Sequence, residues 1–160
     1  MNATMPALLV AAAFGIALAS APARSRAVGM IAFLVAATVV AFAPIPAGWS
    51  EYVHLACWIA IVACAASVHF PYRIGVRASL LLALAAGAAS GAVVDVANAR
   101  AMLVSVTLIV TTACIASRVA AQRVPLAPKI LSSWLIAIAL LAATLQIVPV
   151  TPGYLPDHLE

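Results

Sequence analysis

The residues of this 160-residue chain with the strongest capacity for chemistry are its histidines, cysteines and carboxylates. One apolar run opens with His54 and Cys57, continues through Cys64 and ends with His69. Histidine and cysteine are common ligands of metals and haem. His54 and His69 are fifteen residues apart, about 22 Å along a helix, so they cannot hold one ion together. We therefore expect no metal and no cofactor, and we expect the cysteines to pack as small apolar side chains.

Polar side chains also gather near the ends of the apolar runs. Glu51 and His54 open the third run, whereas Asp95, Asn98 and Arg100 lie between the fourth and the fifth. An acid, an amide and a histidine on one surface suit a lipid-linked head group or a small polar ligand. A histidine–carboxylate pair is the enzymatic alternative. The chain has no nucleophile elbow, glycine-rich phosphate loop or metalloprotease motif, which favours binding over catalysis.

Hydroxyl and amide side chains in the last two apolar runs form a candidate polar path. The set consists of Ser105, Thr107, Thr111, Thr112 and Gln146. Hydroxyls in membrane helices usually bond to their own backbone or to a neighbouring helix. No run carries a carboxylate or a lysine at its centre, which argues against a proton or ion relay. These residues therefore matter most if the protein is a transporter or a channel.

The composition determines which elements must position these residues. The chain is 67% hydrophobic and 8% charged, whereas about a quarter of the residues in a soluble domain are charged. Such a surface must face lipid, which tolerates only helices or closed barrels, and no run alternates in period two. Each apolar run is close to the ~20 residues that cross a bilayer. The sequence predicts a single all-α domain, 1–160, a bundle of six transmembrane helices at about 5–22, 27–44, 52–70, 78–95, 100–117 and 130–148.

The charges alternate between successive gaps. Seven of the eight basic residues fall in every second gap, and all four acidic residues fall in the other gaps and the tail. Because basic loops stay on the cytoplasmic side, we expect a multipass inner-membrane protein with both termini outside. Binding to nucleic acid is excluded, because it would need a solvated basic face and the basic residues lie in short loops beside the membrane. The expected partners of the basic loops are anionic lipid head groups, at Arg24, Arg26, Arg73, Arg77, Arg118, Arg123 and Lys129.

A strip of small residues lies on the fourth apolar run. Ala83, Gly87 and Gly91 follow one another at four-residue spacing, and the two glycines form a G-x-x-x-G motif. Such a strip lets another backbone approach closely. Its partner is the third or fifth helix, or a second protein. Because few residues join the fourth and fifth runs, we expect these two helices to be neighbours.

Residues 44–98 resemble the VanZ-like family of small bacterial membrane proteins. The resemblance is carried by Pro-Ile-Pro at 44–46, Ser-Glu-Tyr-Val-His-Leu at 50–55, a basic turn at 73–77 and Asp-Val-Ala-Asn at 95–98. It covers about a third of the chain. It implies an envelope-associated role linked to glycopeptide resistance.

The leading functional hypothesis is a membrane component that acts without catalysis. Its small-residue faces would bind lipid or partner proteins, either other membrane subunits or a second copy. Subunits of envelope complexes and immunity-type proteins fit this description. A small oligomeric transporter or channel is the first alternative, and a VanZ-like role is the second. An enzyme built on His54, Glu51 and Asp95 stays open but is disfavoured.

Overall fold

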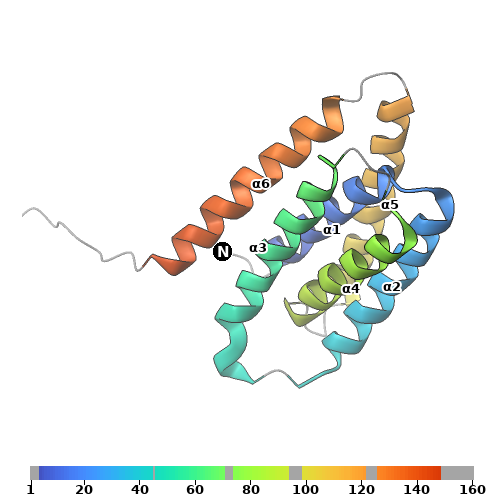
Figure 1. The fold of residues 1–160 in the computed structure, drawn as a ribbon. Helices are drawn as coiled ribbons and strands as arrows, with labels where there is room; N and C mark the ends of the chain where they lie inside the picture. The colour runs from blue at the N-terminus through green and yellow to red at the C-terminus, as the bar shows by residue number, and fades with distance from the viewer. Residues whose placement is uncertain (1–3, 45, 71–73, 94–98, 122–125, 149–160) are drawn as a thin grey trace, which may run out of the picture.

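Six α-helices and one short 3-10 helix make up the described structure. The computed structural model describes residues 4–44, 46–70, 74–93, 99–121 and 126–148, without the side chains of 4, 47, 99–103 and 116–121. In chain order the elements are α1 (Thr4–Ala19), α2 (Ala23–Ala41), η1 (Ala47–Trp49), α3 (Ser50–Ser67), α4 (Val76–Val93), α5 (Ala99–Ala121) and α6 (Leu126–Ile147) (Figure 1). No strand occurs within these ranges. The all-α prediction is confirmed.

Each helix begins one to four residues before its predicted apolar run, so it includes residues that the sequence placed in loops. α2 starts directly after Pro22 and contains Arg24 and Arg26 in its first turns. Arg26 Nε donates a hydrogen bond to the Ala21 carbonyl oxygen over 2.9 Å. A cation at the positive end of a helix dipole costs about 0.3–1 kcal/mol. Helix stability therefore does not explain the position of these arginines.

Four of the six helices are long and apolar enough to cross a membrane, namely α2, α3, α4 and α6. α1 and α5 contain the shorter apolar stretches Met5–Ala19 and Val104–Ile115. The 22 residues of α6 extend about 33 Å, whereas the 16 residues of α1 extend about 24 Å. The hydrocarbon core of a bilayer is about 30 Å thick. The structure thus supports the membrane class through four helices.

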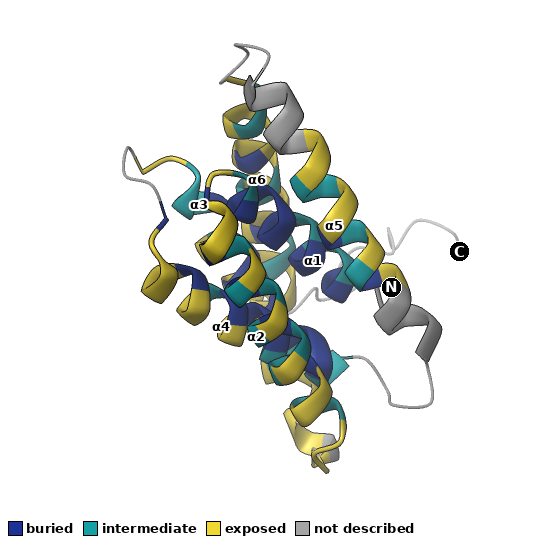
Figure 2. Ribbon diagram, turned by 90° about the vertical axis from the view of Figure 1, so that its right-hand side faces the viewer, coloured by how far each residue is buried: buried dark blue, intermediate teal, exposed yellow. Residues whose placement is uncertain are grey.

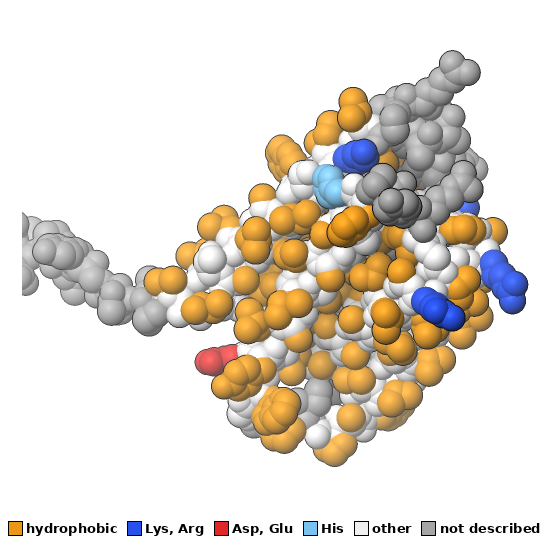
Figure 3. All heavy atoms as spheres, viewed as in Figure 1, with side chains coloured by type: hydrophobic (Ala, Val, Ile, Leu, Met, Phe, Trp, Pro, Cys, Tyr) orange, Lys and Arg blue, Asp and Glu red, His pale blue; other side chains and the backbone are white. Residues whose placement is uncertain are grey.

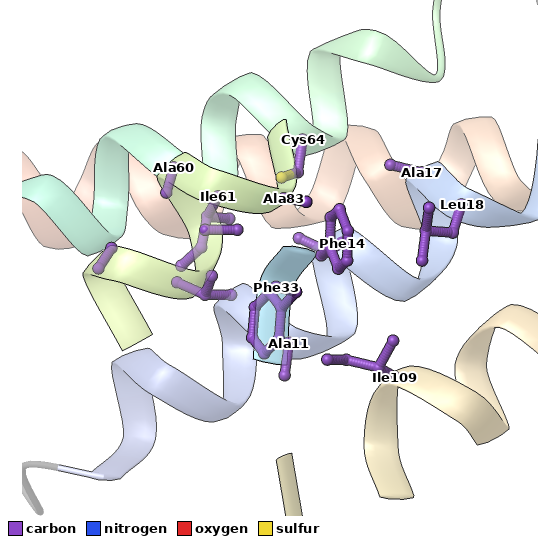
Figure 4. Packing of buried hydrophobic residues seen from close by; sticks show 14 of the residues in the cluster. Ala11, Phe14, Ala17, Leu18, Phe33, Ala60, Ile61, Cys64, Ala83 and Ile109 are labelled. Atoms are coloured by element: carbon purple, nitrogen blue, oxygen red, sulfur yellow. The ribbon is translucent and has the colours of Figure 1, made fainter. Parts of the chain in front are cut away.

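The central helix of the bundle is α1. It packs against α5, α3 and α4, and Figure 2 shows it enclosed by its neighbours. A helix that is apolar on every side belongs in a core, and Val10, Ala11, Phe14 and Ala17 are all at most 1% exposed. Phe14 stacks on Phe33 of α2 with 5.2 Å between the ring centroids (Figure 4).

The α2–α4 pair forms the most extensive helix contact in the structure. The two helices run parallel, because Ser79 Oγ donates to the Ser25 carbonyl oxygen near both starts, and Gly91 lies against Ala37 near both ends. A Cβ on Gly87 would lie 2.5 Å from the Phe33 carbonyl oxygen. The backbones can approach this closely because most of the facing residues are small, with Ser79, Gly87 and Gly91 on α4 and Ser25, Gly29 and Ala37 on α2.

The small-residue strip therefore packs against α2, which the sequence did not name as its partner. The expectation that α4 and α5 are neighbours holds only in part for the described residues: the extensive contacts of α4 are with α2, α1 and α3, and α4 shares with α5 one small cavity, lined by Ser90 and Ser105. A short loop fixes only the distance between the two helix ends that it joins. The faces that fit together decide which helices pack along their length.

The charges separate to the two ends of the bundle. One end of the bundle contains the N-terminal ends of α2, α4 and α6 and the C-terminal end of α3. The hydrogen bond between Ser79 and Ser25 joins the starts of α4 and α2, and the hydrogen bond between His69 and Ser132 joins the end of α3 to the start of α6. This basic end carries Arg24, Arg26, Arg77 and Lys129, whereas Glu51 lies at the opposite end, the acidic end (Figure 3).

Candidate functional site

A cavity of about 590 Å³ opens at the acidic end of the bundle, and we call it the acidic-end cavity. It lies between the starts of α1 and α3 and the close of α6, at the point where α6 departs from the rest of the bundle (Figure 1). Its size is within the ~300–1,000 Å³ typical of ligand sites. The residues that matter for its chemistry are Pro6, Glu51, Tyr52, His54, Leu55 and Gln146.

The start of α3 supplies most of the polar wall. Pro46 precedes η1, and Trp49 N–H donates to the Pro46 carbonyl oxygen over 2.9 Å, so the chain turns directly into α3. Glu51 lies in the first turn, where the positive end of the helix dipole stabilises a carboxylate. His54 follows three residues later on the same helix face. One short turn of sequence thus aims an acid and an imidazole at the same cavity.

The hydrogen bond of His54 fixes its tautomer. Its Nδ1 lies 2.7 Å from the Ser50 carbonyl oxygen, and a carbonyl can only accept, so Nδ1–H is the donor. In the neutral imidazole, Nε2 is then the acceptor. His54 is only partly exposed and lines the cavity, where its Nε2 can accept a hydrogen bond from a ligand.

An amide from α6 completes the polar set. Gln146 lies one residue before the end of α6 and lines the same cavity as Glu51 and His54. The sequence assigned it to a polar path with the hydroxyls of α5. Its actual neighbours could have been found from topology, because the close of α6 and the start of α3 were both predicted on the outer side.

Two of the five residues predicted for a ligand patch meet in this cavity. They are Glu51 and His54. Asp95 and Asn98 lie outside the described residues, and the side chain of Arg100 is not described. The patch therefore gains Gln146 and Tyr52, which the sequence had not grouped with it.

Two of the α5 hydroxyls, those of Thr111 and Thr112, bond within their own helix. Thr111 Oγ1 donates to the Thr107 carbonyl oxygen over 2.8 Å, and Thr112 Oγ1 donates to that of Leu108 over 2.6 Å. Ser105 lines a different cavity of about 20 Å³, large enough for a single water. Neither of these two cavities is lined by both Gln146 and an α5 hydroxyl.

Sequence reasoning missed a histidine–serine cluster at the basic end, because it assigned His69 no partner. His69 Nε2 lies 2.9 Å from Ser132 Oγ, which itself donates to the Lys129 carbonyl oxygen over 2.9 Å. The imidazole must therefore donate to Ser132. Ser133 Oγ lies 3.4 Å from the same nitrogen. The adjacent serines near the start of the sixth helix were the signal that could have revealed this link between α3 and α6.

The cysteines of α3 are part of the core. Cys57 and Cys64 are at most 1% exposed, and Cys57 Sγ donates a weak hydrogen bond to the Ala89 carbonyl oxygen over 3.3 Å. Among the residues that the structure describes, no group of three or more histidine, cysteine or acidic side chains could hold a metal ion. Both thiols fill space between α3 and its neighbours, as small apolar residues do.

Comparisons with protein-family models, with curated proteins and with solved structures gave no match.

Proposed function

We propose that this protein is a multipass inner-membrane protein that holds the head of an amphiphilic ligand in the acidic-end cavity without catalysis. The observation that carries the proposal is the cavity itself. It combines the carboxylate of Glu51, the imidazole of His54 and the amide of Gln146 with the apolar side chains of Pro6 and Leu55. Polar and apolar side chains that line one cavity match a molecule with a polar head and a hydrocarbon part.

In the proposed topology all six helices cross the membrane, and both termini lie outside. Separation of the charges supports it, because basic ends of membrane helices stay in the cytoplasm. Trp49 and Tyr52 support it as well. They form an edge-to-face pair with centroids 6.4 Å apart at the acidic end, and both are more than 60% exposed. Tryptophan and tyrosine favour the interface between lipid and water.

The basic end is proposed to contact anionic lipid head groups. Arg24, Arg77 and Lys129 are exposed there, and each basic residue near an anionic membrane surface contributes about 1 kcal/mol. The energy of this attraction equals or exceeds the energy that it costs to place a cation at the start of a helix. It gives a physical reason for a position that helix stability does not explain.

A role within an envelope complex, beside other membrane subunits or a second copy, belongs to the same proposal. The small-residue strip of α4 is not free for such a partner, because α2 covers Gly87 and Gly91. The VanZ-like resemblance remains a related proposal, since Glu51 and His54 belong both to its motif and to the cavity.

The test is retention of lipid by the purified protein. Leu55→Trp should fill the acidic-end cavity, and lipid that survives purification in mild detergent is measured by native mass spectrometry. We expect the wild type to retain lipid and the variant to lose it. Leu81→Trp, at an exposed position on α4, is the matched control and should retain lipid as the wild type does. Equal retention by all three proteins would contradict the proposal.

A further inference from the structure

The polar wall of the acidic-end cavity is rich in hydrogen-bond acceptors. The ionised Glu51 carboxylate can only accept, and the tautomer of His54 leaves Nε2 as an acceptor. Gln146 adds an amide oxygen from the facing helix. A ligand that fits this wall must bring several hydrogen-bond donors on one small group.

The charge of the cavity favours a cation. Among the described residues that line it, Glu51 carries the only formal charge with His54 neutral. The start of α3 contributes about half a positive charge through its dipole, which is less than the full charge of the carboxylate. The exposed basic residues that the structure describes lie at the other end of helices about 27 Å long, well beyond the screening length of about 8–10 Å.

Aromatic rings and cavity size refine the ligand further. Tyr52 lines the cavity and contacts Trp49 edge to face, and aromatic faces attract ammonium groups. A volume of about 590 Å³ exceeds the needs of a small amine. Leu55 and Ile147 supply apolar wall for the remaining space, which suits the hydrocarbon part of a larger molecule.

We propose that the acidic-end cavity binds the primary ammonium head group of a lipid. The ammonium donates to the Glu51 carboxylate, to His54 Nε2 and to the Gln146 amide oxygen, while the adjoining chain lies along Leu55 and Ile147. This inference rests on the proposed function and names its ligand class. Phosphatidylethanolamine has the required head, and phosphatidylglycerol offers hydroxyls in place of the cation.

The experiment measures head-group preference for the full-length protein. Wild type and variants in mild detergent are titrated with phosphatidylethanolamine, phosphatidylglycerol or free ethanolamine, and bound lipid is counted by native mass spectrometry. We expect phosphatidylethanolamine to bind about ten- to a hundredfold more tightly than phosphatidylglycerol, the range for a charge-assisted hydrogen bond. Glu51→Gln should abolish the preference and Glu51→Asp should keep most of it, whereas Thr38→Ala, at an exposed position on α2 outside the cavity, should leave it unchanged.

The outcomes separate this inference from the proposed function. An equal affinity of the wild type for both lipids, with Leu55→Trp still releasing them, would overturn the ammonium site and leave the amphiphile cavity standing. No effect of Leu55→Trp on either lipid would overturn both. Ethanolamine that binds as tightly as the lipid would support the ammonium site and overturn the lipid as its source. Since Glu51 is exposed, its variants should fold as the wild type does.

Discussion

Replacing Gly87 by alanine tests the closest helix contact in the fold. The added Cβ would lie 2.5 Å from the Phe33 carbonyl oxygen, about 0.9 Å short of ordinary contact at 3.4 Å. The obstacle is backbone, so α2 and α4 must separate along their contact. Overpacking of this kind costs about 1–3 kcal/mol, and the better helix propensity of alanine returns at most about 1 kcal/mol.

We therefore expect Gly87→Ala to lower the free energy of unfolding by about 1–2 kcal/mol. This is roughly a five- to thirtyfold loss in the ratio of folded to unfolded protein. The assay is unfolding by sodium dodecyl sulfate in mixed micelles, followed by tryptophan fluorescence. Gly75→Ala is the matched control, because its Cβ would meet nothing within 4 Å, and it should change stability by no more than about 1 kcal/mol.

Equal stability of Gly87→Ala and the wild type would refute the close approach of α2 and α4. A second variant guards against local relaxation at one position. At Gly91 an added Cβ would overlap the Ala37 carbonyl oxygen, with Ala37 Cα only 2.9 Å away. Gly91→Ala should therefore destabilise the protein at least as much as Gly87→Ala.

Three further predictions concern the basic end, the core and the topology. Ser132→Ala removes the hydrogen-bond partner of His69 and should lower the free energy of unfolding by about 1–3 kcal/mol in the same assay. Thr144→Ala is the control, because its hydroxyl bonds within α6. An equal loss of stability in the two variants would contradict the α3–α6 link. The two buried thiols of α3 should react with a maleimide only after unfolding, and labelling of the native protein would show that α3 packs differently. The topology is tested in a variant whose native cysteines are all replaced by serine. In that variant, Glu51→Cys should be labelled by a thiol reagent from outside intact cells, whereas Arg77→Cys should be labelled only after lysis. The reverse pattern would invert the proposed topology.

The sequence predicted the helices because the thickness of a bilayer fixes the length of an apolar helix that crosses it. It did not predict the central place of α1, although the absence of charge within that helix and its many alanines are consistent with burial on every side. The partner of the α4 strip also escaped prediction. Gly29 of α2 faces Ser79 of α4, but α2 carries no G-x-x-x-G that would announce this match.

The candidate site was predicted in part for a similar reason. Glu51 and His54 share a face because they lie three residues apart in one helix, which local geometry determines. Gln146 joins them through the packing of α6 on α3. That packing depends on long-range fit, and no local pattern in the sequence encodes it.

The most direct test of the proposed lipid site is photo-cross-linking with a lipid whose amine-bearing head group carries a diazirine. The full-length protein is reconstituted with this lipid, irradiated, and the modified peptides are mapped by mass spectrometry. The proposed site predicts cross-links at the start of α3 and the C-terminal end of α6, centred on Glu51, Tyr52 and Gln146, and their loss in Leu55→Trp. Cross-links spread evenly over the exposed faces of α2 and α6, and unchanged in Leu55→Trp, would contradict it.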